Sequence, residues 1–392
     1  MYTISNKMKD MEGSAIRAVL KMTQAKDLIT FAAGVPDPNT LPADFISAEI
    51  QKILKENPAL ALQYGVTDGY APLVSVLTEK MKAMGMDFTS NSLMITSGGQ
   101  QVADLTARCL INEDDVVAVE APTFIGCLNA LRSYKANCIG LPLENDGLDV
   151  SALENLCKEK EVKLLYTIPT FHNPMGVTMS LEKRKKVLEL AEKYDFMILE
   201  DNPYGELRFS GEDVPTMKSM DKNNRVIYAG SLSKVIAPGL RVGWAVAPTP
   251  ILEKMVVAKQ VVDVHTTMLS QIVAHKFITD KDYPNHIERC RALYGKKCQL
   301  MLDCIKEYFP PEVSYTTPNG GLFLWCDMNN GLDSVDVMKK VMEKGAVFIP
   351  GYTFMTDTSK PTSTFRLNYS IPSEDEIKTG IKIIGDVLKS LK

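Results

Sequence analysis

The sequence predicts an α/β protein in which a mostly parallel sheet lies between helices, followed by a smaller α+β domain. From about Asn91 to Val246, short apolar, β-branched runs alternate with longer amphipathic ones, which is the pattern of strands separated by helices. After about Tyr283, a long charged helix leads into short strands and a final amphipathic helix. A chain of 392 residues is long enough for two or three domains.

The alternation between residues 91 and 246 locates the elements of the large domain. Helical patterns cover Gln101–Leu110, after the first strand, and Leu181–Tyr194, before the fourth. The expected strands are, in chain order, Ser92–Thr96, Val116–Val119, Lys163–Ile168, Phe196–Leu199, Val226–Ala229 and Val242–Ala247.

The remaining residues are expected to form the smaller domain and a segment that crosses the join. That segment contains a helix over about Ser14–Lys21 and a proline-rich extended stretch, Val35–Pro42. The smaller domain is expected to contain a helix from Ile287 to about Tyr308, strands near Leu322–Cys326 and Thr364–Tyr369, and a helix from about Ser373 to Leu391. The expected boundaries are 1–48 for an N-terminal segment that packs with the small domain, 49–285 for the large domain and 286–392 for the small one.

The composition excludes several classes of partner. A net charge of −4 and a pI near 5.8 argue against nucleic acid or an anionic membrane as a binding surface. No stretch of 18 apolar residues is present, and Met1–Asp10 lacks the apolar segment of a secretory signal. The eight cysteines form no CxxC pair and the four histidines no metal-binding cluster, so we expect reduced thiols, no metal and a cytoplasmic protein.

The strongest chemical motif is Ser231-Leu-Ser233-Lys234-Val-Ile-Ala-Pro-Gly-Leu-Arg241, directly after an apolar strand. An unprotonated lysine amine condenses with an aldehyde, and nearby cationic charge lowers the pKa of that amine. The arginine offers a rigid fork for a phosphate dianion, and the serines add neutral donors. An aldehyde that also carries a phosphate describes pyridoxal 5′-phosphate (PLP). The alternative is an exposed loop in which these residue types coincide.

Polar residues also follow two other apolar strands. Glu200 and Asp201 come after Phe196–Leu199, where α/β sheets place ligands, and an acid there can pair with a pyridine nitrogen. Spacing alone does not separate the two acids. Tyr204 and Asn173 are candidates to hydrogen-bond the phenolic oxygen of the same ring, although Asp-Asn-Pro and Asn-Pro-x-Gly are also ordinary turn sequences.

Three further features complete the set. The glycine-rich turn Ser97–Gln101 joins a strand to a helix, whose N-terminal N–H groups favour a phosphate. Phe124 follows the next strand and is placed to stack on a flat ring, or else it belongs to the core. Arg366 lies inside an apolar strand of the small domain, where a buried cation needs a partner. That partner is either an external carboxylate or a distant acidic side chain.

Together these residues resemble the class I/II aminotransferases of PLP fold type I, over nearly the whole chain. The closest likeness is to the branch with the 2-aminoadipate, kynurenine and aromatic aminotransferases. The resemblance implies a large, PLP-binding domain with a mostly parallel seven-stranded sheet, plus the smaller α+β domain. The motifs that carry it are SGGQQ (97–101), APTF (121–124), HNPMG (172–176), DNPY (201–204), GSLSKVIAPGLRVGW (230–244) and FR (365–366).

The resemblance also implies a role for each candidate residue. Lys234 resembles the Schiff-base lysine and proton shuttle, Asp201 the partner of the pyridine nitrogen, and Arg366 the receptor of the substrate α-carboxylate. Asn173 and Tyr204 match the phenolic-oxygen partners, and Phe124 the stacking ring. The residues that match the phosphate-binding site are Gly99, Gln100, Ser231, Ser233 and Arg241.

Three further residues match positions that are specific to this branch. The segment around Gly34 resembles the loop that lines the substrate side. Arg17 matches an arginine of the first helix that is a candidate receptor for a distal carboxylate, or else a solvated surface residue. Tyr64 resembles the tyrosine that reaches the phosphate of the neighbouring subunit, which implies a homodimer with composite sites.

Two departures from the family pattern affect cofactor binding. Gly99 stands where serine is common, which removes a hydroxyl but keeps the backbone donor. Phe124 stands where tyrosine is commoner, so this ring stacks without a hydrogen bond.

The reaction that this resemblance implies is ping-pong amino-group transfer from an amino acid to a 2-oxo acid, with 2-oxoglutarate as the expected acceptor. A PLP-dependent lyase or decarboxylase is the alternative on the same scaffold. A PLP-binding regulatory protein is the non-enzymatic alternative. We do not expect it, because only about 48 residues precede the predicted large domain and they contain no basic winged-helix segment.

Overall fold

The computed structural model describes residues 2–9, 11, 13 and 28–391, so Arg17 and the predicted helix over Ser14–Lys21 lie outside the described residues. The large domain is built on an eight-stranded sheet. Its strands are, in spatial order, β2 (Asn91–Thr96), β9 (Gly243–Pro248), β8 (Val226–Ser231), β7 (Met197–Asn202), β6 (Val162–Thr167), β3 (Val116–Ala121), β4 (Asn137–Glu144) and β5 (Gly147–Leu148).

The central five strands, from β8 to β4, run parallel, and β9 runs antiparallel to both β8 and β2. The mostly parallel sheet is therefore confirmed, with one strand more than the seven that the family resemblance implied. The sequence pattern located six of the eight strands and missed β4 as well as β5. The additional strand, β5, has two residues and folds back antiparallel on β4 at a turn where Gly147 has a φ of 110°. A two-residue strand has no periodicity of its own, so the sequence pattern did not predict it.

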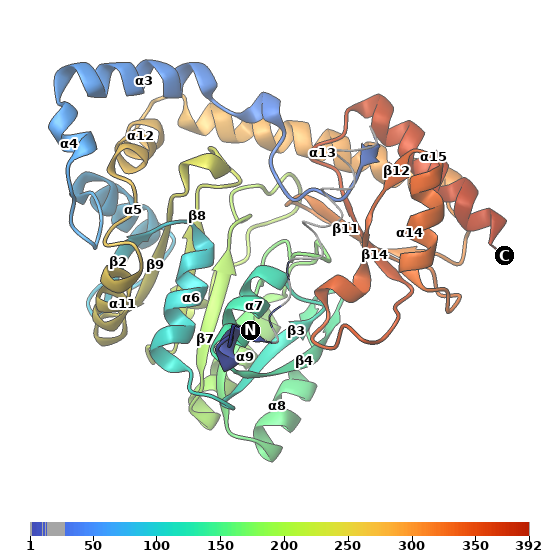
Figure 1. Ribbon diagram of the computed structural model, residues 1–392, viewed down its shortest axis with the longest axis horizontal. Helices are drawn as coiled ribbons and strands as arrows, with labels where there is room; N and C mark the ends of the chain where they lie inside the picture. Colours follow the sequence, from blue (N-terminus) through green and yellow to red (C-terminus); the bar gives the residue numbers. More distant parts are fainter. Residues whose placement is uncertain (1, 10, 12, 14–27, 392) are drawn as a thin grey trace.

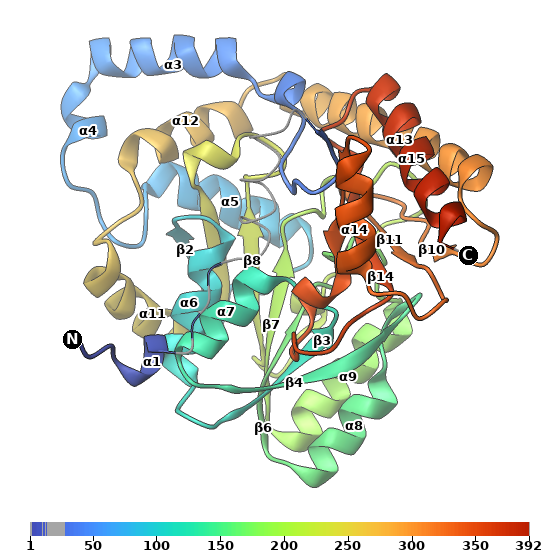
Figure 2. The ribbon, with the colours of Figure 1, turned by 45° about the vertical axis from the view of Figure 1, so that its right-hand side comes forward.

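Helices cover both faces of this sheet because successive side chains of each strand point to opposite sides. Leu164 and Tyr166 pack on one face, and Leu165 of the same strand packs on the other. Figure 2 separates the two groups of helices. The first face is covered by α6 (Gly99–Leu110), α7 (Ile125–Ser133) and α11 (Thr249–Val262), and the second by α8 (Val150–Glu159), α9 (Leu181–Tyr194) and α10 (Met217–Met220).

The smaller α+β domain lies to the right in Figure 1. Its antiparallel sheet has the order β10 (Ser314–Tyr315), β11 (Phe323–Asp327), β14 (Thr364–Asn368) and β13 (Ile349–Pro350). Its helices are α13 (Tyr283–Tyr308), α14 (Ser334–Glu343) and α15 (Glu374–Ser390). Ser373 and Glu376 form a capping box at the start of α15, which explains why that helix begins where the sequence predicts.

The N-terminal segment contacts the small domain. Its strand β1 (Ile29–Thr30) pairs in parallel with β12 (Ala346–Val347), and η1 (Pro38–Thr40) follows. Asp37 is buried and accepts a 2.5 Å hydrogen bond from Lys297 of α13. The β1–β12 pairing before residue 34 and this ion pair after it therefore hold the chain on both sides of that residue. The remaining elements are α1 (Asn6–Lys9), α3 (Ala43–Glu56), α4 (Pro58–Leu62), α5 (Ala71–Ala83), α12 (Met268–Ile278), η2 (Pro238–Leu240) and η3 (Gly351–Phe354).

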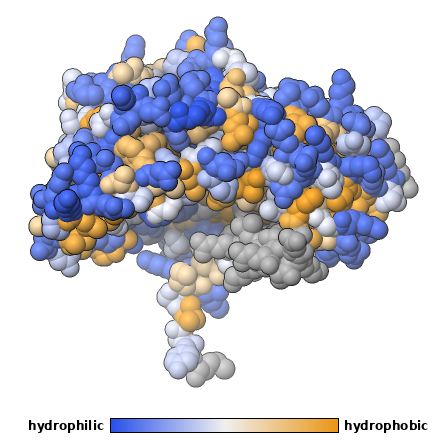
Figure 3. Space-filling view, turned by 90° about the horizontal axis from the view of Figure 1, so that it is seen from above, coloured by the Kyte–Doolittle hydropathy of each residue, from blue (hydrophilic) through white to orange (hydrophobic). Residues whose placement is uncertain are grey.

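The face of the molecule seen in Figure 3 is mostly hydrophilic, with apolar side chains in small groups. Within residues 2–9, 11, 13 and 28–391, no helix has the length and apolar character needed to cross a bilayer. The same part of the chain contains no group of three His, Cys, Asp or Glu side chains placed to hold a metal ion.

Candidate active site

A cavity of about 680 Å³ lies where the large sheet, the N-terminal segment and strand β14 meet. All predicted site residues line it except Tyr64, whose side chain is 80% exposed elsewhere, and Arg17, which is not described. The predicted residues in its wall are Gly34, Gly99, Gln100, Phe124, Asn173, Asp201, Tyr204, Ser231, Ser233, Lys234, Arg241 and Arg366.

The strand directions explain why motifs far apart in sequence converge here. The parallel strands β3, β6, β7 and β8 all end at this edge of the sheet, and ligands of α/β sheets bind beyond such carboxyl ends. Because β9 is antiparallel to both β8 and β2, β2 ends at this edge and β9 begins there. The turn after β2 and Arg241 before β9 therefore meet beside Lys234.

Lys234 follows β8, and its amine donates a 2.7 Å hydrogen bond to the carbonyl oxygen of Gly34. Burial, and after it the positive charges of Arg366 and Arg241, lower the pKa of Lys234 to about 8, against Asp201, which raises it. A neutral amine is the form that attacks an aldehyde. The cavity thus holds a lysine whose amine is partly neutral near physiological pH.

The structure separates the two neighbouring acids of β7. Asp201 points to the cavity side, where the hydroxyl of Tyr166 donates a 2.9 Å hydrogen bond to its Oδ2, and burial raises the pKa of Asp201 to about 6. Glu200 points to the other face of the sheet. There it accepts hydrogen bonds from the backbone N–H groups of Met217 and Lys218, at the start of α10. Glu200 is therefore structural, and Asp201 is the acid that faces the cavity.

Arg366 is a buried cation with neutral partners. Its Nη1 donates to Oδ1 of Asn173 at 2.9 Å and its Nη2 to the carbonyl oxygen of Ala32 at 2.7 Å. Its guanidinium also lies over the ring of Phe323, at 4.3 Å from the centroid. Burial lowers the pKa of Arg366 to about 10, so the side chain stays charged at neutral pH.

No carboxylate among the described residues pairs with Arg366, and its Nε has no hydrogen-bond partner there. A buried, unpaired guanidinium is costly, and a carboxylate is the anion that its fork fits best. Asn173 links this cation to Tyr204, because its Nδ2 donates a 3.4 Å hydrogen bond to the Tyr204 hydroxyl. The arrangement therefore favours an external carboxylate held beside the phenol of Tyr204.

The opposite end of the cavity is suited to a phosphate. The backbone N–H groups of Gly99 and Gln100 are the first of α6 and have no partner within that helix. Arg241 lies beside them, and its Nη2 donates to the carbonyl oxygen of Ser97 at 3.1 Å. Gly98 has a φ of 84°, and a Cβ there would lie 2.3 Å from Nη2 of Arg241. Only glycine therefore permits this close approach of loop and arginine.

A buried network beneath this loop was not predicted from the sequence. Lys259 of α11 is fully buried and donates to Oε1 of Gln101 and to both carboxylate oxygens of Asp263. Ser97 and Gln101 in turn donate to Asp263. The QQ pair of the motif thus has two functions, since Gln100 lines the cavity and Gln101 anchors the loop. A lysine four residues before an aspartate, directly after the apolar run Met255–Ala258, was the available signal.

Several cavity residues were also not singled out from the sequence. Ile125 and Asn129 of α7 line the wall beside Phe124, and Gln100 donates a 2.7 Å hydrogen bond to the carbonyl oxygen of Gly126. His172, interpreted from the sequence as structural, is buried with its Nε2 at 3.0 Å from Oε2 of Glu120.

The residues around the cavity fit PLP, part by part. Lys234 would supply the amine for the aldehyde, and Asp201 would offer a carboxylate to the ring nitrogen, since both line the cavity. Asn173 and Tyr204 lie on one side as donors, and Phe124 is in the wall. The helix start and Arg241 form the phosphate end. The class of protein that this site defines is an enzyme acting on amines and carboxylates.

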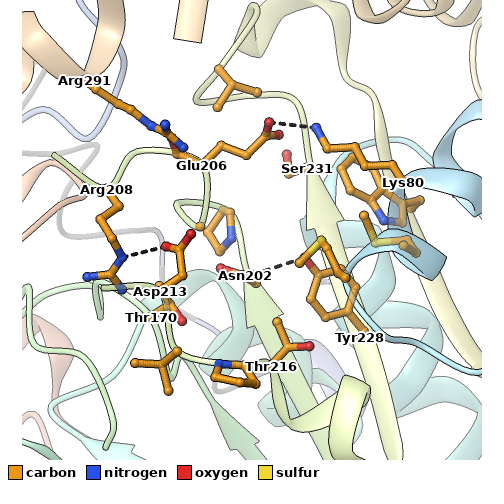
Figure 4. A pocket seen from close by; sticks show the side chains of 18 residues that line it. Lys80, Thr170, Asn202, Glu206, Arg208, Asp213, Thr216, Tyr228, Ser231 and Arg291 are labelled. Atoms are coloured by element: carbon orange, nitrogen blue, oxygen red, sulfur yellow. Dashed lines mark hydrogen bonds and ion pairs between the residues drawn. The ribbon is translucent and has the colours of Figure 1, made fainter. Parts of the chain in front are cut away.

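A second cavity, of about 390 Å³, shares Pro203 and Ser231 with the first (Figure 4). Four of its charged side chains are paired with one another, and the fifth, Arg291, is paired with Glu288 outside the cavity. Lys80 lies 2.7 Å from Glu206, and Arg208 lies 2.8 Å from Asp213. All three cations of this cavity are thus neutralised by ion pairs, so it resembles a phosphate site less than the first does.

Comparison with known proteins identifies the family. The sequence matches the model for "Aminotransferase class I and II" over residues 26–384. It is 40% identical to the aromatic-amino-acid aminotransferase 1 of Thermococcus litoralis, over 98% of this chain and 94% of the relative. It is 34% identical to the 2-aminoadipate transaminase of Thermus thermophilus, over 97% of this chain and 95% of the relative.

A crystal structure of Pyrococcus horikoshii kynurenine aminotransferase, in complex with PMP, has a TM-score of 0.95 and 39% identity to this chain. The match covers 99% of this chain and 97% of that one. The chain therefore belongs to the class I and II aminotransferases and has their type I fold. It is an enzyme that transfers the amino groups of amino acids.

Proposed function

We propose that this enzyme moves the α-amino group of an amino acid to a 2-oxo acid, with 2-oxoglutarate as the acceptor, in two half-reactions at one site. Its cofactor is PLP. The observation that carries the proposal is one cavity that holds both a lysine with a lowered pKa, Lys234, and a buried guanidinium with no carboxylate partner among the described residues, Arg366. These are receptors for an amine-reactive group and for an α-carboxylate.

Each end of the cavity has a separate task. When bound, PLP supplies the aldehyde that amines condense with and the ring that accepts electrons. The N–H groups of Gly99 and Gln100, the hydroxyls of Ser231 and Ser233, and Arg241 would hold the phosphate. Asp201 would keep the ring nitrogen protonated, Asn173 and Tyr204 would bind the phenolic oxygen, and Phe124 would stack on the ring.

Lys234 acts as the base and acid of the reaction. The neutral amine of Lys234 would accept the α-proton of the substrate as a base and later donate a proton as an acid. Its pKa of about 8 allows both protonation states to be populated near neutral pH. Arg366 and Asn173 orient the substrate carboxylate and so hold the α-proton near Nζ of Lys234. In the first half-reaction an amino acid enters and leaves as its 2-oxo acid. In the second, a different 2-oxo acid enters and leaves as its amino acid.

Incubation of the holoenzyme with a single amino acid tests this proposal. Transfer of the amino group predicts stoichiometric release of one 2-oxo acid and conversion of the absorbance to that of the pyridoxamine form. Release of pyruvate and ammonia without that conversion would identify a lyase, and release of carbon dioxide a decarboxylase. Either result would overturn the proposal.

The amino donor is proposed from the relatives. Those described above are named for aromatic amino acids, 2-aminoadipate and kynurenine. We propose that the donors of this enzyme come from these chemical classes, and that Arg17 binds the distal carboxylate of an acidic donor while the segment at Gly34 lines the substrate side. A panel of donors with 2-oxoglutarate tests this in Arg17→Ala. A selective loss of activity toward 2-aminoadipate is expected, and an equal loss with phenylalanine would contradict it.

We also propose that the enzyme is a homodimer in which Tyr64 reaches the phosphate of the neighbouring subunit. Support comes from exposed apolar side chains on two adjoining segments, where the N–H of Gly65 donates to Nε2 of His265 at 3.2 Å. Such clustered exposure is typical of an interface. These residues are Leu60, Leu62, Tyr64 and Val66 on one segment and Val257, Val261, Val262 and Val264 on the other.

The dimer is tested by light scattering after chromatography. The double variant Leu62→Asp, Val261→Asp is expected to be monomeric, to bind PLP weakly and to be inactive. A wild-type protein that is monomeric and fully active would overturn this proposal. A cytoplasmic location is proposed as well, and it is supported by the eight cysteines, all of which are free thiols.

A further inference from the structure

Tyr166 is the described residue in direct contact with Asp201, and none of the predicted roles involves it. The two side chains lie on neighbouring parallel strands, β6 and β7. Tyr166 is level with Leu199, and Asp201 is two residues further along β7. Positions two residues apart on a strand share one face, so Tyr166 and Asp201 are diagonal neighbours on the cavity side of the sheet.

The contact leaves one carboxylate oxygen free. The hydroxyl of Tyr166 donates to Oδ2 of Asp201 at 2.9 Å, whereas Oδ1 accepts no hydrogen bond from any residue that the structure describes. Oδ1 lies toward the start of α6, since a Cβ added to Gly99 would be 3.9 Å from it. Tyr166 itself has no exposed surface. The phenol of Tyr166 therefore holds Oδ2 of Asp201 on the side away from solvent, and Oδ1 stays free to face the cavity.

The direction of this hydrogen bond is fixed. Burial raises the pKa of Tyr166 well above its usual range, and the negative charge of Asp201 raises it further. The hydroxyl thus keeps its proton at neutral pH, where the ionised carboxylate of Asp201 can only accept, and Tyr166 is therefore the donor. A buried carboxylate with one such donor is more stable as an anion than it would be without it.

We propose that Tyr166 is a positioning residue for the ring-nitrogen carboxylate, holding Oδ2 of Asp201 so that Oδ1 remains an ionised, correctly directed acceptor for the protonated nitrogen of the cofactor. This inference rests on the role proposed above for Asp201. Tyr166 does not touch the cofactor; it acts through the aspartate.

Other titratable groups also face Asp201. Lys234, after β8, lowers the pKa of Asp201, and Glu120 of β3 raises it. Cys127 of α7, Tyr204 and Tyr228 of β8 lie near enough for the aspartate to raise their own pKa values. The thiol and the two phenols are neutral at physiological pH, and none of the three donates a hydrogen bond to Asp201 among the described contacts. Tyr166 is therefore the neutral donor that favours the charged form of Asp201, beside one cation, Lys234.

Removal of the hydroxyl has a predictable spectroscopic effect. Without its donor, Asp201 becomes more basic and draws the ring proton toward itself. A ring nitrogen with less positive charge withdraws less electron density from the nitrogen that links Lys234 to the cofactor. The pKa of this linking nitrogen is therefore higher. In Tyr166→Phe holoenzyme we expect the midpoint of the visible absorbance titration to rise by about half a pH unit, and PLP to bind about tenfold more weakly.

Two variants frame this experiment. Asp201→Asn removes the charge altogether, and its midpoint is expected to rise further than that of Tyr166→Phe. Tyr228→Phe is the matched control, because it deletes another buried hydroxyl of the same sheet, one that accepts a hydrogen bond from Asn202 and does not touch Asp201. Its midpoint should equal that of the wild type. Thermal unfolding of the two phenylalanine variants checks that both are folded.

The outcomes separate this inference from the function proposed above. A wild-type midpoint in Tyr166→Phe with a raised midpoint in Asp201→Asn would overturn the role of Tyr166 and leave that of Asp201 standing. A wild-type midpoint in Asp201→Asn would overturn both. Equal shifts in Tyr166→Phe and Tyr228→Phe would show a general loosening of the sheet, and the inference would fail.

Discussion

The two halves of the active-site cavity are built differently. In the cofactor half, Asp201 lies at the end of a strand and Lys234 and the turn at Gly99 follow strands of the same sheet, and a buried layer supports them from below. The substrate half is assembled from separate parts of the chain. Gly34 comes from the N-terminal segment and Arg366 from the small domain, and they meet only where these parts touch.

This difference determines what each half contributes. One rigid sheet holds the amine, the ring acid and the phosphate loop at fixed spacing, as binding of a constant cofactor requires. Segments from different domains change their spacing when the domains move, which suits substrates that enter and leave. Substitutions in the first half should therefore alter PLP binding and the chemical step. Those in the second half should alter substrate binding with the cofactor in place.

The largest effect is expected for Lys234→Ala, in the cofactor half. Loss of the amine removes both the covalent attachment of the cofactor and the group that moves the α-proton, and general acid–base catalysis alone contributes about 10²–10⁴-fold. We expect kcat to fall by at least about 10³-fold while the thermal unfolding profile changes little. Retention of measurable turnover at the wild-type rate would place the base elsewhere.

Arg366→Ala tests the substrate half. A charge-assisted hydrogen bond contributes about 1.5–3 kcal/mol, so kcat/KM should fall roughly 10- to 150-fold for every donor, mainly through KM. PLP should remain bound, because Arg366 contacts Asn173 and Ala32 rather than the phosphate end. Arg366→Lys keeps the charge without the planar fork and should recover only part of the loss. A defect confined to one donor would contradict the α-carboxylate role.

Lys259→Met tests the layer beneath the phosphate loop. It leaves Asp263 with its hydrogen bonds from Ser97 and Gln101 but without its cation, and the loss of a hydrogen bond to a charged group costs about 1.5–3 kcal/mol. PLP affinity is therefore expected to fall about tenfold, with KM for the amino donor nearly unchanged in the PLP-saturated enzyme. Lys254→Met is the matched control, since Lys254 is exposed on the same helix. If the two variants bind PLP equally well, the network does not position the loop.

A smaller effect is expected in the pH dependence of the rate at which the cofactor-free enzyme binds PLP. Lys234 has a pKa of about 8 in the folded protein, below its usual value, so its amine is protonated below pH 8 and neutral above it. The rate at which the cofactor-free enzyme captures PLP should rise with pH and level off above about 8. In Arg366→Ala the midpoint should move upward, because one of the charges that lower the pKa is lost. Stopped-flow absorbance measures both rates, and an unmoved midpoint would contradict this electrostatic coupling.

The smallest effect is expected at Gly99, where the family commonly has serine. A Cβ at Gly99 would make only ordinary contacts, at 3.8 Å to Ser231 and 3.9 Å to Asp201. Gly99→Ser should therefore fit and add one donor for the phosphate, raising PLP affinity about two- to tenfold. Gly98→Ser should lower the affinity, because its φ of 84° and the 2.3 Å approach to Arg241 exclude a side chain. Weaker binding in Gly99→Ser would argue that the phosphate lies elsewhere.

The cofactor half and the substrate half also differ in how much of each could be predicted from the sequence. Residues that follow apolar strands, such as Asp201 and Lys234, were predictable because the carboxyl ends of parallel strands converge. Tyr166 was not, although it lies inside the predicted strand Lys163–Ile168, and neither was Lys259. Their function depends on which strand or helix lies beside them, and a sequence pattern does not specify neighbours in space. The order of the strands, with β6 next to β7, supplied that information.

The substrate half was predicted less completely for a related reason. Burial of Arg366 followed from its apolar strand, but its contacts with Ala32 and Asn173 depend on how three segments meet. The two-residue strand β5 had no periodicity to detect. The choice between Glu200 and Asp201, which spacing left open, was settled by the alternation of β7, because Glu200 faces the start of α10 instead.

The central claim is that Lys234 carries the cofactor, and chemical reduction of the holoenzyme tests it most directly. Borohydride fixes an amine-linked PLP permanently, and mass spectrometry of the digested protein then locates it. We predict one phosphopyridoxyl group per chain, on the peptide that contains Lys234. A label on another lysine, or a holoenzyme that loses all of its cofactor on denaturation after reduction, would contradict the account.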